Sequence, residues 1–361
     1  MSPSIRFPEF TGEWEKCKIE DITDAVSSGK SKNHFSNGEY NLYGSTGIIG
    51  RTDKALYDGK LVLVARVGAN AGFLQIINEP CGITDNTLIL KPKGIDAFYL
   101  YYFLQHFNLN RLIFGSGQPL ITGGMLKKVK VSLGTISEQS KIVKFLSLLD
   151  ERIATQVRLI EDLKKLRCAI VEKMFKQSKA NGRLGDFIEQ VSVRNKNGLY
   201  SNVLSVSNKQ GFVKQSEQFE DRTVASEDTS NYKIVKRNNF AYNPARINVG
   251  SIARLTKFDV GIVSPMYVCF RTKASIIPEY MEAFFTSQQF FYEMMKRLEG
   301  SVRLCLSYEG LCNIPVYIPD MNKQIAMGQN ISLILSKIGL EIEYLGRLHQ
   351  QKQYLLRKMF I

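Results

Sequence analysis

The sequence contains one long segment twice, and this repeat constrains the fold more than any other feature. Residues 138–175 and 323–360 both end in Lys-Met-Phe, with Met174 and Met359 lying 185 positions apart. Solenoid repeats have much shorter units, of ~20–50 residues. The period therefore predicts a duplicated domain, and a duplicated domain indicates two similar targets.

Each copy predicts a long helix whose apolar residues recur at steps of three and four, the spacing of a coiled-coil seam. Thr135 and Glu138 can form a capping box before the first helix, and Pro319-Asp320 precedes the second. Each helix would be roughly 50–55 Å long. We expect them to pair antiparallel and to dock partner subunits; the alternative is that each stripe packs on a globular core. The seam and docking residues we expect are Leu146, Leu149, Ile153, Ile160, Leu163, Ile331, Ile334, Ile338, Leu345 and Leu348.

The rest of the sequence predicts two globular modules of mixed strands and helices. Short β-branched and aromatic runs are broken by Gly, Asn and Asp. The expected strands are 61–68, 86–92, 239–247 and 266–272, and the expected aromatic-rich helices are 98–107 and 280–295. We predict an α+β fold with pseudo-twofold duplication, in which a coiled coil of two long antiparallel helices separates the modules. Its parts are a first module at 1–134, a long helix at 135–180, a second module at 181–318 and a second long helix at 319–361.

The charge of the chain indicates a polyanionic partner. Its 48 Lys and Arg exceed its 34 Asp and Glu, for a net charge of +14, and the basic residues are spread along the chain. Each phosphate that a basic residue neutralises releases counterions, so nucleic acid is the leading partner. The alternative is a merely soluble basic protein.

Other classes of protein are disfavoured by the composition. No apolar run approaches the ~20 residues that a bilayer requires, and the N-terminus lacks a signal-peptide pattern. We therefore expect a cytoplasmic protein without membrane association. Six scattered cysteines without C-x-x-C spacing and three distant histidines predict buried free thiols and no metal site.

Two glycine-containing strings after predicted strands supply candidate binding residues, at 65–72 (ARVGANAG) and 245–253 (ARINVGSIA). Glycine allows close backbone approach, so Arg and Asn there could reach phosphates or base edges; a tight turn with a solvated Arg is an equally weighted alternative. The divergent loops after the aromatic helices supply further candidates. The candidates are Arg66, Asn70, Ser116 and Gln118 in the first module, and Arg246, Asn248, Ser301 and Arg303 in the second.

Motifs for catalysis are missing from the sequence, and no residue is predicted to be catalytic. The string 242–246 (YNPAR) lacks the second Pro and the aromatic residue of an adenine methyltransferase motif, and we interpret it as a strand end with a turn. There is no G-x-x-x-x-G-K-[ST] loop for ATP and no nuclease motif, and Pro319-Asp320 fits a helix N-cap better. These absences favour a binding subunit.

The layout resembles the specificity (S) subunits of type I DNA restriction–modification systems along the whole chain. The similar segments are 5–22 (IRFPEFTGEWEKCKIEDI), 43–50 (YGSTGIIG) and the two Gln-led helices that end in Lys-Met-Phe. The second module departs from the pattern because it lacks the RFPEF-x-GEW lead and starts at 182–191 (GRLGDFIEQV). In addition, Asp150 of the first helix corresponds to Leu335 of the second.

The resemblance implies two target recognition domains, each of which reads one half of a bipartite DNA site. The two helices would set the spacer between the half-sites and dock two modification subunits, which carry S-adenosylmethionine and methylate adenine N6. Restriction subunits, when added, cleave unmethylated DNA with ATP and Mg. This chain would hold no cofactor and would not be an enzyme. A stand-alone nucleic-acid-binding scaffold and a self-sufficient DNA adenine methyltransferase remain as alternatives.

Overall fold

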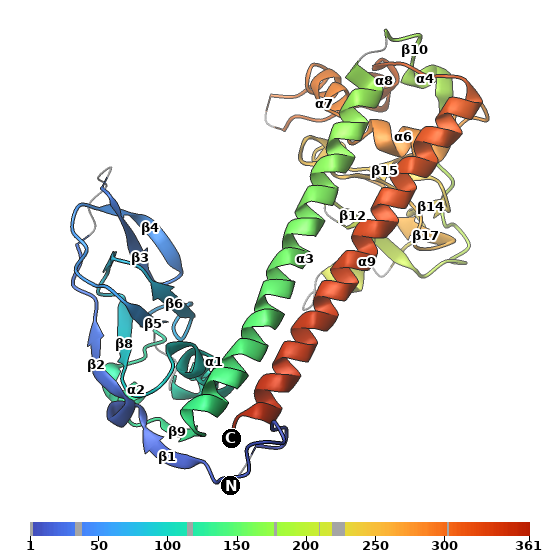
Figure 1. The fold of residues 1–361 in the computed structure, drawn as a ribbon. Coiled ribbons are helices and arrows are strands. Elements are labelled where there is room, and N and C mark those ends of the chain that lie inside the picture. The colour runs from blue at the N-terminus through green and yellow to red at the C-terminus, as the bar shows by residue number, and fades with distance from the viewer. Residues whose placement is uncertain are drawn as a thin grey trace. The chain divides into compact units, whose positions relative to one another are not determined.

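In the computed structural model, the chain is divided into two compact units (Figure 1). The structure describes residues 3–32, 38–113, 118–176, 179–208, 210–218, 228–301 and 303–361. Unit 1 comprises Met1–Val157 with Glu343–Ile361, and unit 2 comprises Arg158–Ile342. Each unit therefore holds one globular module together with parts of both long helices.

The module of unit 1 contains small sheets of four, three and two strands, together with short helices. Its strands are β1 (Glu15–Lys18), β2 (Thr23–Ser28), β3 (Tyr40–Gly44), β4 (Gly47–Thr52), β5 (Lys60–Ala65), β6 (Leu74–Asn78), β7 (Cys81–Ile83), β8 (Thr87–Pro92) and β9 (Lys130–Leu133). Its helices are η1 (Ile19–Ile22), α1 (Ala97–Phe107), η2 (Leu109–Leu112) and α2 (Gly123–Lys127). The sheet orders are β2-β8-β5-β6 and β4-β3-β7, and β1 pairs with β9.

The central strand β5 is buried on both faces, which explains its continuous apolar run. Val62 and Val64 pack in the core that includes α1, whereas Leu61 and Leu63 pack in a second core with β7. Successive side chains of a strand point to opposite faces, so one apolar strand joins both layers of the module.

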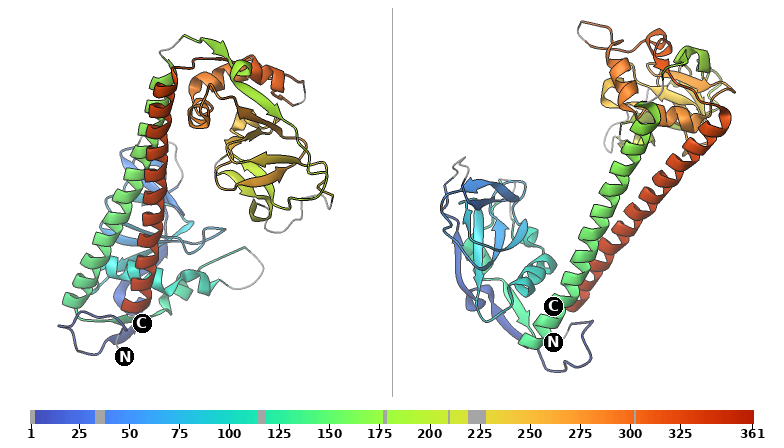
Figure 2. Two further views of the ribbon diagram at one scale, coloured as in Figure 1. Left: turned by 90° about the vertical axis from the view of Figure 1, so that its right-hand side faces the viewer. Right: turned by 45° about the horizontal axis from the view of Figure 1, so that its top comes forward.

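The module of unit 2 has a similar set of elements (Figure 2). Its strands are β10 (Gly182–Arg183), β11 (Ile188–Val191), β12 (Val203–Ser207), β13 (Gly211–Lys214), β14 (Lys233–Lys236), β15 (Phe240–Tyr242), β16 (Ile252–Arg254), β17 (Val260–Val263), β18 (Val268–Thr272) and β19 (Pro315–Val316). Its helices are α4 (Leu184–Phe187), α5 (Gln215–Gln218), η3 (Ile247–Val249), α6 (Pro278–Phe284), α7 (Gln288–Met295) and α8 (Tyr308–Cys312).

The two modules share one topology, which confirms the predicted α+β class and the duplication. The order β11-β18-β15-β16 repeats β2-β8-β5-β6, and the parallel pair β12–β17 repeats the parallel pair β3–β7. Unit 2 adds β14, which pairs with β17. The strands expected from the sequence lie in equivalent places in the two sheets, so the repeat extends beyond the long helices.

The prediction of a single helix at 280–295 is wrong, because the structure has two helices there, α6 and α7. The hydroxyls of Thr286 and Ser287 donate to the carbonyls of Ala283 (2.8 Å) and Phe284 (2.7 Å) and so end α6. The Ser287 hydroxyl also accepts from Phe290 N (3.1 Å), which starts α7 with an N-cap.

The long helices α3 (Ile136–Lys176) and α9 (Met321–Met359) confirm the predicted repeat, and each passes through both units. Asp320 Oδ1 accepts from Lys323 N (3.0 Å), as an N-cap should, and this bond lowers the pKa of Asp320. At the start of α3, only one of the two hydrogen bonds of the expected capping box forms. Thr135 Oγ1 accepts from Glu138 N (3.3 Å), but the Glu138 carboxylate turns away from the cap.

The buried Glu138 carboxylate instead holds the N-terminal lead of the chain. It accepts from Arg6 at 2.6 and 2.8 Å and from Trp14 Nε1 at 3.1 Å. The second module lacks this lead, and Lys323 stands where Glu138 is in the first copy. A buried carboxylate is tolerated only with such partners. The first copy therefore has both the N-terminal segment and the glutamate, and the second copy has neither.

The two helices run antiparallel within each unit. In unit 1, Lys352 pairs with Asp150 (2.6 Å) and Arg152 lies over the Tyr344 ring (5.4 Å). In unit 2, Val171 and Ile331 belong to one core. All ten predicted seam residues are buried or half-buried. The periodic positions Val157 and Leu166 are exposed, at 38% and 51%.

The repeated Lys-Met-Phe ends anchor each helix in a module. Phe360 packs with Tyr99 in the core of unit 1, and Phe175 packs with Tyr280 in the core of unit 2. The alternative of helix packing on a globular core therefore holds at these ends, whereas the ten predicted seam residues between them are shielded from solvent. None of the helices in the described part of the chain combines the length and the apolar character needed to cross a membrane.

A buried glutamine fixes the first turn of each long helix to its module. Gln139 donates to Gly134 O (2.9 Å), and Gln324 donates to Pro319 O (2.9 Å). The Gln324 amide also accepts from Ile277 N (3.0 Å) at the start of α6. Because a buried amide is costly without partners, these bonds explain why each helix has a glutamine in its first turn.

The cysteines are all free thiols, as expected, but only Cys81 and Cys269 are buried. Cys168 is exposed because it lies on the solvent face of α3. Among the described residues, no three His, Cys, Asp or Glu side chains gather where a metal ion could bind.

Candidate nucleic-acid interface

A loop of the same length follows the central strand of each module. In unit 1, Ala65 N donates to Phe73 O (2.9 Å); in unit 2, Asn243 N donates to Ser251 O (3.1 Å). Each bond closes a loop of seven residues between β5 and β6 or between β15 and β16. The two loops can therefore be compared position by position.

Two of the predicted site residues occupy the same position of this loop. Asn70 and Asn248 are each followed two residues later by a glycine, Gly72 or Gly250. These glycines have φ values of 87° and 89°, a left-handed conformation that favours glycine. The shared glycine explains why the two strings look alike in sequence.

The two predicted arginines are not equivalent, although both follow a strand. Arg66 occupies the first position of its loop, where the second module has Pro244, whereas Arg246 occupies the third. Arg66 is half-buried, its Nη1 donates weakly to Ser28 Oγ (3.4 Å), and its Nε is buried without a partner among the described residues. The Arg246 side chain is exposed.

The string 242–246 forms a turn, as interpreted from the sequence. Asn243 Oδ1 accepts from Ala245 N (3.0 Å), and Asn243 O accepts from Arg246 N (3.0 Å). This Asx turn directs the chain out of β15 and presents the side chain of Arg246.

The second predicted loop lies beside the first in each module. Ile121 N donates to Arg66 O (2.9 Å), and Leu306 N donates to Pro244 O (3.1 Å). Gln118 is exposed just before Ile121. The candidates Ser301 and Arg303 are exposed as well, Asn248 is half-buried, and Ser116 lies outside the described residues.

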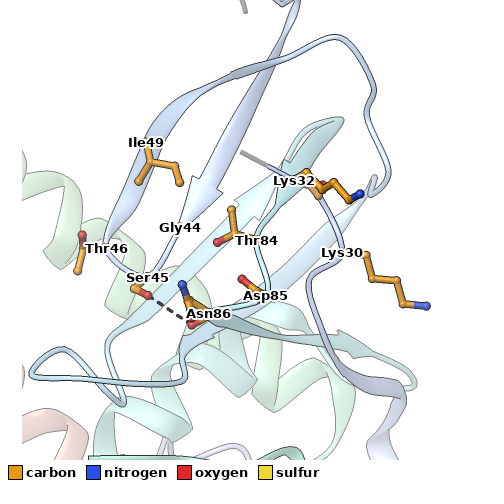
Figure 3. Close-up of a pocket in the computed structure, with 10 residues that line it drawn as sticks. Lys30, Lys32, Gly44, Ser45, Thr46, Ile49, Thr84, Asp85 and Asn86 are labelled. Atoms are coloured by element: carbon orange, nitrogen blue, oxygen red, sulfur yellow. Dashed lines mark hydrogen bonds between the residues drawn. The ribbon is translucent and has the colours of Figure 1, made fainter. Parts of the chain in front are cut away.

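A concavity of about 630 Å³ opens in unit 1 beside these loops (Figure 3). It lies between the β3–β4 hairpin, the β7–β8 turn and the segment after β2. Ser45 Oγ donates to Asn86 O (3.3 Å) across its floor, and Arg66 N donates to the same carbonyl (2.9 Å). Lining side chains include Lys30, Lys32, Ser45, Thr46, Asp85 and Asn86. We call it concavity 1.

Unit 2 has a concavity of about 740 Å³, which we call concavity 2. It is lined by β12, the start of α5, the β17–β18 turn and the two loops described above. Lining side chains include Ser205, Gln215, Tyr232, Met266, Arg246 and Arg303. Two predicted arginines thus meet here, although 56 residues separate them in sequence.

The two concavities occupy the same place in the shared topology. Thr87 N donates to Thr84 O (3.1 Å) in the turn of unit 1, and Tyr267 N donates to Ser264 O (3.1 Å) in the turn of unit 2. Both turns connect equivalent strands, and both lie at the end of the parallel strand pair. The scaffold is therefore repeated while the lining side chains differ.

Four cationic side chains that line the concavities have no polar partner in the described part of the chain. Lys30, Lys32, Arg246 and Arg303 make no side-chain hydrogen bond or ion pair with the described residues. In contrast, Arg254 pairs with two glutamates on α6. Free cations around a polar hollow are suited to a polyanion.

Sequence reasoning missed several lining residues, among them Lys30, Asp85 and Gln215. The one sequence signal for this place is the segment 43–50, whose Gly44, Ser45 and Thr46 line concavity 1. The predicted Asn70 instead lines a separate hollow of about 300 Å³ next to Asn108.

Comparison with known protein families identifies the first half of the chain. A family model described as the type I restriction modification DNA specificity domain matches residues 11–165. A protein of Mycoplasma genitalium assigned as a type I specificity subunit is 28% identical over 189 residues, which cover 50% of this chain and 49% of the relative.

Two further curated relatives match shorter stretches. The specificity subunit of the type I restriction enzyme EcoprrI of Escherichia coli is 28% identical over 112 residues, 31% of this chain and 28% of the relative. That of the MjaVIII enzyme of Methanocaldococcus jannaschii is 31% identical over 119 residues, 32% of this chain and 28% of the relative. The chain thus spans about half or less of the length of these relatives.

Two solved structures share the fold along nearly the whole chain. The crystal structure of the type I restriction–modification S subunit from M. genitalium aligns with a TM-score of 0.65 and 20% identity, covering 100% of this chain and 99% of that one. A chain from a study of complex assembly and conformational transition of the type I system aligns with a TM-score of 0.58 and 11% identity, covering 97% and 98%. Residues 11–165 therefore match the type I restriction modification DNA specificity domain, and the chain as a whole shares the fold of these solved structures.

Proposed function

We propose that this chain is the DNA sequence-specificity subunit of a type I restriction–modification complex. Each module reads one half of a bipartite DNA site, and the long helices set the spacer between the halves. The observation that carries this proposal is the pair of concavities, which have one scaffold, free cations at both and different lining side chains. Repeated scaffolds with divergent linings suit two half-sites of different sequence.

The domain limits that follow are those expected from the sequence. Residues 1–134 and 181–318 act as target recognition domains, and residues 135–180 and 319–361 act as spacer helices. Phosphate contacts by lysine and arginine position each domain, and a few side chains at the concavities specify bases. The expected contact residues are Arg66, Asn70, Ser116, Gln118, Arg246, Asn248, Ser301 and Arg303.

The long helices also dock two modification subunits in this proposal. Exposed apolar residues recur on them at the offset of the sequence repeat: Leu148 is 55% exposed and Leu333 is 68% exposed. Ile136 and Met321 form a second such pair, at 61% and 39%. Equivalent apolar patches on two equivalent helices suit two copies of one partner.

The chemistry belongs to those partners, and the chain acts as a non-catalytic reader of cytoplasmic DNA. S-adenosylmethionine would be held by the modification subunits, which methylate adenine N6. Restriction subunits, where present, would supply the ATP- and Mg-dependent cleavage. A purified chain titrated with S-adenosylmethionine should therefore release no heat of binding; saturable binding would favour a self-sufficient methyltransferase instead.

Sequencing of methylated bases in host DNA tests the proposal directly. With the gene intact, we expect methyladenine in one bipartite motif, and deletion of the gene should abolish that motif. A motif that persists after deletion would sink the proposal. A chain that binds RNA, or duplex DNA without preference for a split site, would support the scaffold alternative.

A further inference from the structure

We infer that concavities 1 and 2 hold the base-reading side chains of their modules and that the two select different bases. Asp85 in concavity 1 selects a base with an amine at its major-groove edge, cytosine or adenine, and Arg246 in concavity 2 selects a guanine. This inference rests on the proposed function. It goes beyond it by naming the side chain in each module and the chemical class of base that it reads.

The carboxylate of Asp85 is the informative group of concavity 1. It is exposed on the β7–β8 turn and makes no ion pair or hydrogen bond with the described residues. Figure 3 shows it on the turn, between Ser45 on one side and Lys30 and Lys32 on the other. An acidic group without a cationic partner is therefore placed among cations that suit phosphates.

A carboxylate in such a place has few favourable partners on DNA. Phosphates repel it, and the base edges of the major groove offer amine donors only at cytosine N4 and adenine N6. The neighbouring lysines can bind the phosphates that flank the base. Asp85 therefore forms a favourable hydrogen bond only where the DNA sequence presents one of these amines, and in this way it selects the base.

The turn of concavity 2 cannot read a base in this way, because it carries Pro265 and Met266 in place of Asp85 and Asn86. Neither side chain accepts a hydrogen bond from an amine with useful strength. The exposed group here is Arg246, which follows the Asx turn of Asn243. A guanidinium matches guanine O6 and N7 with two parallel hydrogen bonds.

A buried acceptor supports this reading of concavity 2. Gln215 lines the concavity, and its Oε1 is buried without a partner among the described residues. A buried acceptor without a partner on the protein is suited to a donor from a bound ligand. The N4 amine of the cytosine that pairs with guanine is such a donor.

The backbone around Arg246 is well fixed, as a base-reading side chain requires. Arg246 O accepts from Ser251 N (3.1 Å) and from Val249 N (3.2 Å), and Arg246 N donates to Asn243 O (3.0 Å). These bonds hold the loop before DNA arrives, so less conformational entropy is lost on binding.

Methylated-base sequencing of hosts that carry single variants tests both assignments in the complete complex. Asp85→Ala removes the acceptor. It should relax one cytosine or adenine position of a half-site, with a loss of discrimination of about 5- to 150-fold, and leave the other half-site intact. Arg246→Ala should relax one guanine in the other half-site to a similar extent. Should Asp85→Ala fail to accumulate, Asp85→Leu makes the same test.

Two matched variants control for charge. Asp53→Ala removes an exposed carboxylate of the same module outside the concavity, and Arg271→Ala removes an exposed arginine whose ion pair among the described residues is with Glu189. Neither should change the motif. An unaltered motif in Asp85→Ala or Arg246→Ala, or methylation that falls equally at all sequences, overturns the base-reading assignment. Absence of any bipartite motif in the unmutated host refutes the proposed function instead, so the two failures are distinguishable.

Discussion

Replacement of Phe360 by alanine tests how the C-terminal end of α9 is anchored. The Phe360 side chain is 3% exposed, and its ring centroid lies 5.2 Å from Tyr99, 6.2 Å from Phe103 and 5.9 Å from His106. Truncation of a buried phenylalanine to alanine costs about 3–5 kcal/mol, because the lost transfer free energy is joined by the cost of the cavity. At about 2–4 °C per kcal/mol for a unit of this size, unit 1 should melt about 6–20 °C lower.

Differential scanning calorimetry measures the shift, and amide hydrogen exchange assigns it to a unit. Phe360→Ala should raise exchange in unit 1, whereas Phe175→Ala should do so in unit 2, where Phe175 is 1% exposed and lies 5.2 Å from Tyr280. Tyr354→Ala is the control, since Tyr354 is 52% exposed on the same helix and should change the unfolding free energy by less than about 0.5 kcal/mol. If Phe360→Ala melted like this control, or loosened unit 2 instead, the anchoring argument would be refuted.

Three further predictions concern buried polar groups. Glu138→Gln removes the carboxylate that binds Arg6 and Trp14 and should lower the unfolding free energy by about 3–5 kcal/mol in urea titrations; a loss below about 1 kcal/mol would contradict this reasoning. Gln324→Leu leaves the backbone groups around it unpaired, at about 1–3 kcal/mol each, whereas Gln324→Glu should retain part of the stability. Burial lowers the pKa of His106, so the unfolded chain, with a pKa of about 6.5, binds more protons than the folded one. Stability should therefore fall as pH drops below about 6.5, and His106→Asn should remove that part of the urea-midpoint change between about pH 5 and 8; an unchanged pH dependence would exclude this role.

The long helices could be predicted almost completely from the sequence, because their signals are local. The expected segment 138–175 became α3, Ile136–Lys176, and Asp320 caps α9 as expected. The prediction failed where tertiary partners compete with local pattern. Glu138 left its capping box for Arg6 and Trp14 because a buried carboxylate gains more from a cation and an indole N–H than from one backbone amide.

The candidate site could be predicted only in part. Loop chemistry pointed to Arg246 and Arg303, which meet at concavity 2. Asp85 and Gln215 were missed because nothing near them in sequence marks them. Asp85 becomes a neighbour of the first loop only when the parallel strand pair brings the β7–β8 turn beside the end of β3. Gln215 reaches concavity 2 only because β13 pairs with β12.

The sequence by itself determined that the fold contains a duplicated domain with two long helices. It also determined a net positive charge that suits a polyanionic partner. Helix periodicity, apolar anchors and net charge are carried by residue types and their spacing, so one chain is enough to see them. Only the tertiary structure decided which loop positions correspond. Arg66 and Arg246 look alike in sequence, but strand pairing aligns Arg66 with Pro244 and places Arg246 two positions later in its loop, where it lines concavity 2. The physical reason is that strand register is set by the backbone hydrogen bonds between strands, and the order of residues along one chain does not reveal these bonds.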